Sequence, residues 1–266
     1  MAFGPLVGFQ LIQPGEVAPA HRHTMTAIRF VLKGKGAYTN VEGEKMIMEA
    51  GDLILTPQWT WHEHANEGDE PMVWADGLDV PLIESLEVIS VERYAEKRLS
   101  VKEGCIHPSL YGMARPASLP MGRLTPPLHY RWQDTYASLK LLAESVPHPY
   151  EGIALDYVNP LTGGPTLPTL LCRIQMLRPG EQTKSHRHRS TSIYHVFCGR
   201  GTTVINGESF RWEQGDTFVV PLRSWHEHAN GSAKDEAILF SMHDTPVLQA
   251  FGLYREEGQG DSHIGL

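Results

Sequence analysis

Residues 15–38 read GEVAPAHRHTMTAIRFVLKGKGAY, and residues 51–66 read GDLILTPQWTWHEHAN. Side chains at positions i and i+2 of a β-strand project from the same face, so His21 and His23 are expected to point the same way. His62, on a neighbouring strand of the same sheet, would complete a cup of three imidazoles. Neutral imidazole is a common ligand of iron, zinc, copper and nickel. If the chain held only one HxH motif, its two histidines could instead be surface residues or hydrogen-bonded core residues that bind no metal.

The whole arrangement occurs twice in the chain. A shift of 165 residues places the HRH of residues 21–23 on a second HRH at 186–188. After a gap of one residue, WHEHAN at 61–66 falls on WHEHAN at 225–230. We therefore interpret the chain as two copies of one unit. The repetition favours a metal-binding cup over an incidental pair of histidines.

Each copy has the pattern of a β-structure. Short apolar or alternating runs such as AIRFVLKG and DLILTP are separated by Gly, Asn and Pro. Hairpin turns are expected at 41–44 and 205–208. Many short strands with regularly spaced turns predict an all-β sandwich or small barrel in each copy.

The connector between the copies differs from both of them. Residues 107–127 are rich in Pro and Gly and are expected to be irregular. Residues 132–145 (WQDTYASLKLLAES) carry apolar side chains at helical spacing, which predicts one amphipathic helix packed on a barrel. We therefore divide the chain into a first copy at 1–92, a connector at 93–169 and a second copy at 170–266.

Composition limits the class of protein. The chain has 266 residues, 41% of them hydrophobic, which fits a globular protein with a well-buried core. Its formal charge of -8 argues against non-specific binding to nucleic acid or to an anionic membrane. The N-terminus has no basic start and no long apolar run, so neither a signal peptide nor a transmembrane helix is expected.

The cysteines are Cys105, Cys172 and Cys198. They are too few and too irregularly spaced for a disulfide framework or a zinc–thiolate site. We expect buried, reduced thiols in a cytoplasmic protein.

Both copies resemble the cupin signatures, GxxxxxHxH followed by GxxxxxPxxxxHxxxN. More specifically, the chain is similar to the gentisate 1,2-dioxygenase family, which includes salicylate and 1-hydroxy-2-naphthoate dioxygenases. The similarity is carried by APAHRHTMTAIRFVLKGKGAYT, TPQWTWHEHAN, NPLTGG at 159–164 and YHVFCGRG at 194–201. It covers almost the entire chain. It implies a bicupin with a double-stranded β-helix, or jelly-roll barrel, in each copy and a metal in the barrel mouth.

The chain departs from the cupin pattern in two places. The glutamate usual four or five residues after the second histidine is absent, because Ala27 and Ile28 stand there. Trp59 replaces the glycine that usually follows the proline. Three histidines without a carboxylate point away from germin-like and oxalate-decarboxylating cupins. Family members also usually carry a longer stretch before the first cupin, which implies a truncated N-terminus here, or different substrate anchoring and subunit contacts.

The resemblance implies an Fe(II)-dependent extradiol-type dioxygenase. Its reaction would be cleavage of the aromatic ring of gentisate (2,5-dihydroxybenzoate) with O2 to give maleylpyruvate. The family pattern further implies a homo-oligomer, expected to be a tetramer. By resemblance the iron ligands would be His21, His23 and His62, and the substrate pocket would be lined by Gln10, Arg29, His64 and Asp76.

The ligand count supports that chemistry. Three protein ligands leave three positions on six-coordinate iron, enough for a bidentate aromatic ortho-hydroxy acid and dioxygen. Orienting both reactants at one centre supplies a large rate factor. Three neutral imidazoles leave the metal its full charge, which favours an anionic chelating substrate.

Arg29 shares strand parity with His21 and His23 and is expected to point into the barrel. A buried guanidinium is costly unless paired, and a substrate carboxylate would pair with it bidentately. A salt bridge to an internal carboxylate such as Asp76 is the alternative.

His64 shares parity with His62 and is expected to be a hydrogen-bonding group or general acid–base near bound oxygen. Asp76 would orient His64 or accept a substrate proton, with a turn residue as the alternative. Trp61, next to the third ligand, would contact the aromatic substrate or pack the barrel mouth.

The second copy retains His186, His188 and His226 as a possible second metal site. Tyr194 stands in place of the arginine of the first copy and Ser241 in place of its aspartate. The second copy is therefore expected to lack the anchoring cation and the inner carboxylate. We predict that the N-terminal copy is catalytic and that the C-terminal copy is structural or vestigial.

Other functions fit the same residues. Within the class, the substrate could be salicylate or 1-hydroxy-2-naphthoate. Outside it, the alternatives are a non-catalytic metal-binding bicupin and a cupin isomerase or lyase with another divalent metal. The open-sided cup and the interior Arg29 favour catalysis.

Overall fold

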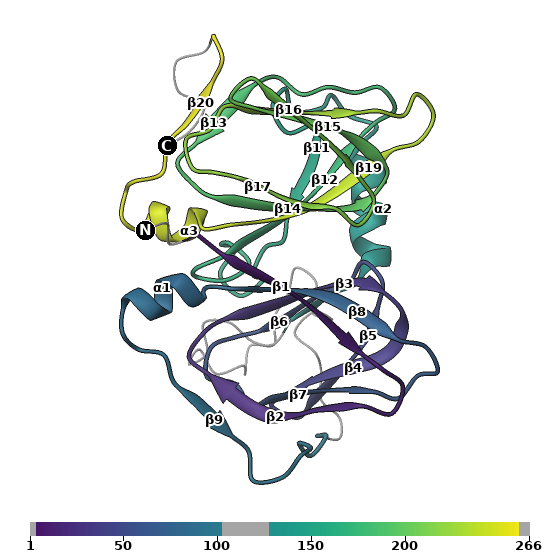
Figure 1. The fold of residues 1–266 in the computed structure, drawn as a ribbon, viewed down its shortest axis with the longest axis vertical. Helices are drawn as coiled ribbons and strands as arrows, with labels where there is room; N and C mark the ends of the chain where they lie inside the picture. The colour runs from purple at the N-terminus through teal and green to yellow at the C-terminus, as the bar shows by residue number, and fades with distance from the viewer. Residues whose placement is uncertain (1–3, 103–127, 261–266) are drawn as a thin grey trace. The chain divides into compact units, whose positions relative to one another are not determined.

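The computed structural model describes residues 4–102 and 128–260 of the chain (Figure 1). Cys105 and the run 107–127 lie outside the described residues. The chain forms two compact units, and each contains one copy of the repeat. The first comprises Met1–Thr135 and Val158–Leu167, and the second comprises Tyr136–Tyr157 and Pro168–Leu266.

The first unit is built from two five-stranded antiparallel sheets. Their strand orders are β1-β8-β3-β6-β10 and β5-β4-β7-β2-β9. A helical turn, α1 (Val80–Ser85), lies between β8 and β9 in the chain. The strands are β1 (Leu6–Ile12), β2 (Val17–His23), β3 (Ala27–Lys33), β4 (Lys35–Val41), β5 (Glu44–Glu49), β6 (Leu53–Thr56), β7 (His62–Asn66), β8 (Met72–Leu78), β9 (Val91–Arg93) and β10 (His129–Tyr130).

The core of this unit lies between its two sheets. Each fully buried large apolar side chain contributes about 1.5–3 kcal/mol to folding. The buried cluster draws on strands of both sheets and consists of Ile12, Val31, Ala37, Val41, Met46, Met48, Ile54, Met72 and Trp74.

The second unit repeats this plan, with sheets β11-β12-β19-β14-β17 and β16-β15-β18-β13-β20 (Figure 1). It ends with helix α3 (Thr245–Ala250) and strand β20. Its core cluster includes Tyr194, Val196, Trp212 and Leu239. The strands are β11 (Ile153–Asp156), β12 (Leu171–Leu177), β13 (His186–His188), β14 (Ser192–Cys198), β15 (Arg200–Ile205), β16 (Glu208–Glu213), β17 (Thr217–Val220), β18 (His226–Asn230), β19 (Ala237–His243) and β20 (Glu256–Gly258).

The predicted all-β architecture, with one sandwich-like barrel per copy, is confirmed. The hairpin turns expected at 41–44 and 205–208 join β4 to β5 and β15 to β16. Both central residues of each turn have positive φ, as a two-residue hairpin requires: 55° and 92° at Glu42 and Gly43, and 49° and 88° at Asn206 and Gly207.

A β-bulge explains the one-residue gap in the repeat. Lys35 pairs with Glu49 and Tyr38 with Ile47, so β4 advances three residues while β5 advances two. The corresponding pair, β15 and β16, runs without a shift in register. The extra residue of the first copy is therefore accommodated in the bulge, and the strand pairing resumes after it.

The predicted connector helix is α2, which spans Trp132–Leu142. Leu139 on this helix is fully buried. Asp52 accepts a hydrogen bond of 2.8 Å from the backbone N–H of Trp132, at the start of the helix. A Cβ on Gly51 would lie 2.5 Å from the Trp132 ring, so this contact requires glycine.

Of the cysteines within the described ranges, Cys172 is buried and Cys198 is partly buried, and both are thiols. No helix in residues 4–102 or 128–260 combines the length and the apolar composition that crossing a bilayer requires.

Candidate active site

The first barrel brings His21, His23 and His62 together. His21 stands directly opposite His62 in the pairing of β2 with β7. The ring centroids lie 4.4 Å (His21–His62), 4.8 Å (His23–His62) and 5.6 Å (His21–His23) apart. One ligand nitrogen from each ring lies within 4.8 Å of the other two. The i and i+2 spacing on one strand, with a partner across the ladder, produces this cup.

Backbone carbonyls orient all three rings. The Nδ1 atoms of His21, His23 and His62 lie 2.8, 2.9 and 2.9 Å from the carbonyl oxygens of Pro19, Met25 and Thr60. A carbonyl oxygen only accepts, so each Nδ1 carries the proton and each Nε2 keeps its lone pair. The Nε2 of His62 is buried and has no hydrogen-bond partner within the described part of the chain. Three convergent, unprotonated Nε2 atoms fit a divalent transition-metal ion.

Burial disfavours the charged forms of His23 and His62. It lowers the pKa of His23 to about 4 and that of His62 well below the usual value for histidine. The positive charge of Arg29 lowers the pKa of His62 further. Neutral imidazoles are the form that binds metal, so His23 and His62 need not release protons near neutral pH.

Arg29 is 3% exposed and lies on β3, in the other sheet from His21 and His23, so the regular strand assumed for all three residues is wrong. Its Nε lies 3.3 Å from Oδ1 of Asp76, and its Nη1 donates to the hydroxyl of Thr56. The salt bridge considered as the alternative for Arg29 is thus present. Burial raises the pKa of Asp76, and Arg29 opposes that shift.

The Asp76 carboxylate is part of a wider network. Trp74 Nε1 donates to it at 3.0 Å, and the side chain of Gln10 also hydrogen-bonds to it. Gln10 itself is largely exposed on β1. Asp76 therefore lies on a strand and links Arg29 to Gln10, which rules out the turn position considered for it.

His64 is buried next to the cup, with its ring centroid 5.8 Å from that of His62. Its Nδ1 lies 2.9 Å from the hydroxyl of Thr39, and its Nε2 is buried without a partner among the described residues. The same hydroxyl lies 3.4 Å from Sδ of Met48. When the hydroxyl donates to the sulfur, Nδ1–H donates to Thr39 and Nε2 is the basic nitrogen. Burial, then the charge of Arg29, lowers the pKa of His64 well below its usual value.

Trp61 packs against Arg22 and Tyr94. Its ring is 4.5 Å from the guanidinium carbon of Arg22 and makes an edge contact with Tyr94 at 4.9 Å. Arg22 alternates with His21 and His23 along β2 and therefore projects from the opposite face. These contacts pack Trp61 against the outer side of β2, and a contact between Trp61 and the substrate stays a prediction.

Trp59 stands where cupins usually carry glycine and has a backbone conformation that favours glycine. Its φ is 59°, in the left-handed region, and its N–H donates to the carbonyl of His23 at 2.7 Å. Arg223 occupies the same position in the second copy, with φ 63° and a 2.7 Å bond to the carbonyl of His188. This turn links the segment before the third histidine to the HxH strand in both copies.

The second barrel forms a similar cup from His186, His188 and His226, whose ligand atoms also lie within 4.8 Å of one another. His186 pairs directly with His226, with ring centroids 4.2 Å apart. His186, Glu151 and Glu256 form a second cluster of potential ligands that shares its histidine with the first.

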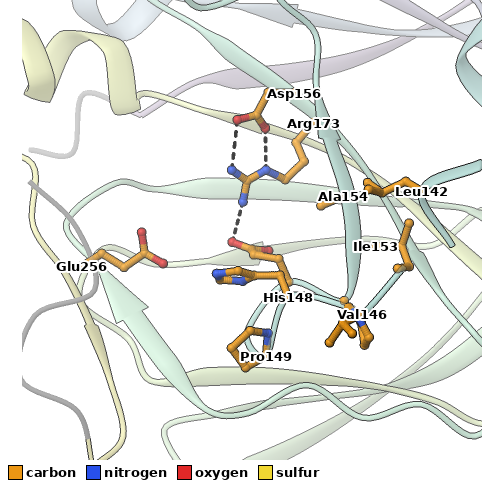
Figure 2. A pocket seen from close by; sticks show the side chains of 12 residues that line it. Leu142, Val146, His148, Pro149, Ile153, Ala154, Asp156, Arg173 and Glu256 are labelled. Carbon is orange, nitrogen blue, oxygen red and sulfur yellow. Dashed lines mark hydrogen bonds and ion pairs between the residues drawn. The ribbon is translucent and has the colours of Figure 1, made fainter. Parts of the chain in front are cut away.

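The expectation that the second copy lacks an inner cation and carboxylate is wrong. Tyr194 and Ser241 face each other across β14 and β19, where Arg29 and Asp76 face each other in the first copy. The cation instead comes from β12, where Arg173 pairs with Ser241. Arg173 forms ion pairs with Glu151 and Asp156, and these three residues line a cavity of about 610 Å³ (Figure 2).

Sequence reasoning missed Thr39, Thr56, Glu151, Arg173 and Glu256. Only Thr39 left a usable signal. Once the gap of the repeat is placed at the β4 bulge, Thr39 aligns with Thr203, whose hydroxyl lies 2.8 Å from Nδ1 of His228. The repeat gave no reason to select the other four.

Comparison with known proteins agrees with this geometry. The sequence profile of the cupin domain matches residues 8–81 and 173–243. A 5-aminosalicylate 1,2-dioxygenase of Comamonas sp. is 46% identical over 254 residues, covering 94% of this chain and 67% of that protein. Gentisate 1,2 dioxygenase 1 of Aquipseudomonas alcaligenes is 37% identical over 259 residues, covering 94% of this chain and 72% of that protein.

A crystal structure of salicylate 1,2-dioxygenase from Pseudoaminobacter salicylatoxidans, described as adducts with gentisate, superposes with a TM-score of 0.85. It is 32% identical, and the match covers 98% of this chain and 73% of that one. This chain therefore spans about two thirds to three quarters of the length of these relatives. The duplicated cupin match and these long similarities show that the chain belongs to the family of bicupin ring-cleaving dioxygenases that includes the gentisate and salicylate 1,2-dioxygenases.

Proposed function

We propose that the first barrel is the active site of an Fe(II)-dependent dioxygenase that opens the ring of gentisate with O2 and gives maleylpyruvate. The observation that carries the proposal is the cup of three Nε2 atoms from His21, His23 and His62 close to the buried, charged side chain of Arg29. When bound, iron(II) would supply the redox chemistry that dioxygen and a closed-shell aromatic ring lack on their own.

The donor set suits this substrate class. Among the described residues, no carboxylate joins the three imidazoles in the first cup. Arg29 and Asp76 are oppositely charged, so the net positive charge of a bound ion is not cancelled by neighbouring side chains. A carboxylate with an adjacent phenolic oxygen is then favoured as a chelating anion over a neutral ligand.

Arg29 would bind the substrate carboxylate. Asp76 and Thr56 hold its guanidinium inside the barrel. A fixed guanidinium can present parallel N–H groups to a carboxylate, and the interaction is strong where water is excluded. In this role Arg29 fixes the orientation of the ring.

His64 would hold or move a proton. Its buried Nε2 has no partner in the described part of the chain, and Thr39 fixes the ring through Nδ1. Because its pKa is well below the usual value, His64 is neutral near pH 7, and its Nε2 can accept a hydrogen bond from a phenolic hydroxyl.

A second candidate substrate is 5-aminosalicylate. The relative named for that substrate has the higher identity of the two curated relatives compared above. Gentisate and 5-aminosalicylate share a carboxylate, an ortho hydroxyl and an electron-donating group at ring position 5. The two hypotheses therefore require the same chelation and the same role for Arg29.

Oxygen uptake by the iron-loaded protein tests the proposal. Protein loaded anaerobically with Fe(II) is mixed with gentisate, 5-aminosalicylate, salicylate, 1-hydroxy-2-naphthoate or 3-hydroxybenzoate, and oxygen is then admitted. We expect one O2 consumed per gentisate, with a new absorbance from the ring-opened product, and no uptake with 3-hydroxybenzoate, which cannot chelate. The ratio of kcat/KM for the first two compounds decides between the candidates. No uptake with any ortho-hydroxy acid would contradict the proposal.

By the same family resemblance, we propose a cytoplasmic homotetramer. Sedimentation of the purified chain at micromolar concentration tests the oligomer size, and a monomer would contradict it.

A further inference from the structure

The three histidines of the second barrel lie beside two carboxylates that have no counterpart in the first cup. The Nε2 of His186 lies 3.6 Å from Oε1 of Glu151 and 3.9 Å from Oε1 of Glu256. Both distances are too long for hydrogen bonds but short enough for two ligands of one ion. Glu151 precedes β11, and Glu256 lies on β20, so distant parts of the unit converge here.

The polar atoms around this point lack partners. Both ring nitrogens of His186, the Nε2 of His226 and the Oε2 of Glu151 are buried without a hydrogen bond within the described residues. His186 is fully buried and Glu151 is 9% exposed. An unsatisfied buried carboxylate oxygen beside unsatisfied imidazole nitrogens is costly unless a cation binds both.

One oxygen of each carboxylate is held by a neighbouring side chain. Oε1 of Glu151 accepts from Arg173, which also pairs with Asp156. Oε2 of Glu256 accepts a 2.9 Å hydrogen bond from the hydroxyl of Tyr254, while its Oε1 is the atom that faces His186. Figure 2 shows Glu256 projecting into the same space as the Arg173–Asp156 pair.

The charges fit a divalent ion. Glu151, Asp156 and Glu256 are the carboxylates that line the cavity, and Arg173 is the guanidinium among them. Three carboxylates and one guanidinium leave an excess of two negative charges, which one divalent cation would neutralise. The cavity of about 610 Å³ is lined by Glu151 and Glu256 and gives such an ion access to these two carboxylates.

The two barrels diverge at equivalent positions. His188 pairs with Glu256 on β20, whereas His23 pairs with Val91 on β9. On the outer face the frameworks remain alike, because Arg22 bonds Glu92 as Arg187 bonds Glu257. Glu256 therefore occupies the position of Val91, while the strand pairing around it is the same in both barrels.

We propose that the second barrel binds a divalent transition-metal ion through His186, His188, His226 and the carboxylate of Glu151, with Glu256 adjacent to the ion. The two observed ligand groups share His186, and three histidine nitrogens with one carboxylate oxygen would fill the four positions of a tetrahedral zinc ion. The ion ties the segment before β11 to strands β13 and β18. The site differs in donor set and role from the open cup of the first barrel.

Zinc titration of variants tests this site separately from the first. The probe is Zn²⁺ alone, counted by metal analysis after equilibrium dialysis of the full chain. We expect two equivalents per wild-type chain and one per His62→Ala chain. In the His62→Ala background, Glu151→Gln should weaken the remaining site at least ten-fold. Glu257→Gln, on the neighbouring residue of β20 that faces Arg187, is the matched control and should leave binding unchanged.

The zinc measurements can contradict either the second metal site or its carboxylate ligand. No zinc bound to folded His62→Ala protein would mean that His186 is an ion-pair partner of Glu151 in a metal-free barrel, and would overturn the proposal. Equal zinc affinity with and without Glu151→Gln would overturn the carboxylate ligand. Zinc should also raise the melting temperature of His62→Ala protein but not of the Glu151→Gln double variant at the same zinc concentration. An equal rise in both would contradict the closed site.

Discussion

Arg29 lies directly opposite Asp76 in the register of β3 and β8, and their side chains form an ion pair of 3.3 Å inside the first barrel. Both side chains are 4% exposed. Removing one charge would leave the other buried and uncompensated, at a cost of about 3–5 kcal/mol. A test of substrate binding must therefore preserve the charge at position 29.

Arg29→Lys keeps the charge but loses the planar guanidinium. An ammonium group can still neutralise Asp76, but it cannot offer two parallel N–H groups to a substrate carboxylate. We expect KM for gentisate to rise about 10–100-fold, from the loss of roughly 1.5–3 kcal/mol of charged hydrogen bonding, with iron content unchanged. Steady-state kinetics and metal analysis measure both quantities.

Arg22→Lys is the control, because Arg22 projects from the outer face of β2 and pairs with Glu92. Its KM should match the wild type. An unchanged KM in Arg29→Lys, together with a lower melting temperature, would show that Arg29 acts only as the partner of Asp76.

Thr39→Val removes the hydroxyl that holds Nδ1 of His64. Without it the ring and its tautomer are less fixed, so we expect kcat to fall up to about ten-fold, the equivalent of one hydrogen bond. The acid limb of the kcat–pH profile should also shift, while iron content and KM stay near the wild-type values. Thr203→Val removes the equivalent hydroxyl beside His228 and is expected to leave kcat unchanged. A similar loss from both variants would mean that the hydroxyls act through stability alone.

Gly201→Ala should prevent stable folding of the second unit. An added Cβ would lie 2.1 Å from the backbone oxygen of Ala229 and 2.3 Å from the Trp212 ring. Neither the strand pairing nor the buried ring can move away without breaking the core. Gly8→Ala is the control, since a Cβ there meets nothing within 4 Å. Thermal unfolding of both variants measures the difference, and equal melting temperatures would contradict the packing described for Trp212.

His195 should make stability depend on acid pH. Burial lowers its pKa from the usual 6.5 to about 4. Between these values the unfolded chain binds a proton that the folded chain does not, so the free energy of unfolding falls as the pH decreases from 6.5 to 4. The expected contribution is about 2–3 kcal/mol. Urea unfolding at pH 4.5 and 7 should show a smaller difference for His195→Gln than for the wild type. An unchanged difference would exclude His195 as a contributor.

Much of the site was predictable because it follows local rules. Strand parity places His21 and His23 on one face, and the repeat identifies His62 as the partner across the ladder. Arg29 comes from the other sheet, which parity along one strand could not predict. The HxH spacing, the hairpin turns and the connector helix depend on a few neighbouring residues each. These features can be predicted without knowing how distant strands pair.

The second cluster was not predictable for the opposite reason. Glu151 precedes the repeated segment, and Glu256 lies on a short strand near its end, so aligning the two copies gives neither residue a role. Arg173 aligns with Gly8, which suggests no function. Their convergence depends on how β11, β12 and β20 pair, which a single sequence does not specify.

Oxygen uptake by His62→Ala and His226→Ala proteins, each with its metal content measured, tests the central assignment most directly. Both substitutions remove an equivalent buried imidazole, so loss of packing affects them alike. If the first barrel is the active site, His62→Ala loses gentisate-dependent uptake, while His226→Ala loses one metal equivalent and keeps most of its turnover. Full uptake by His62→Ala, or equal loss of uptake from both folded proteins, would contradict the account.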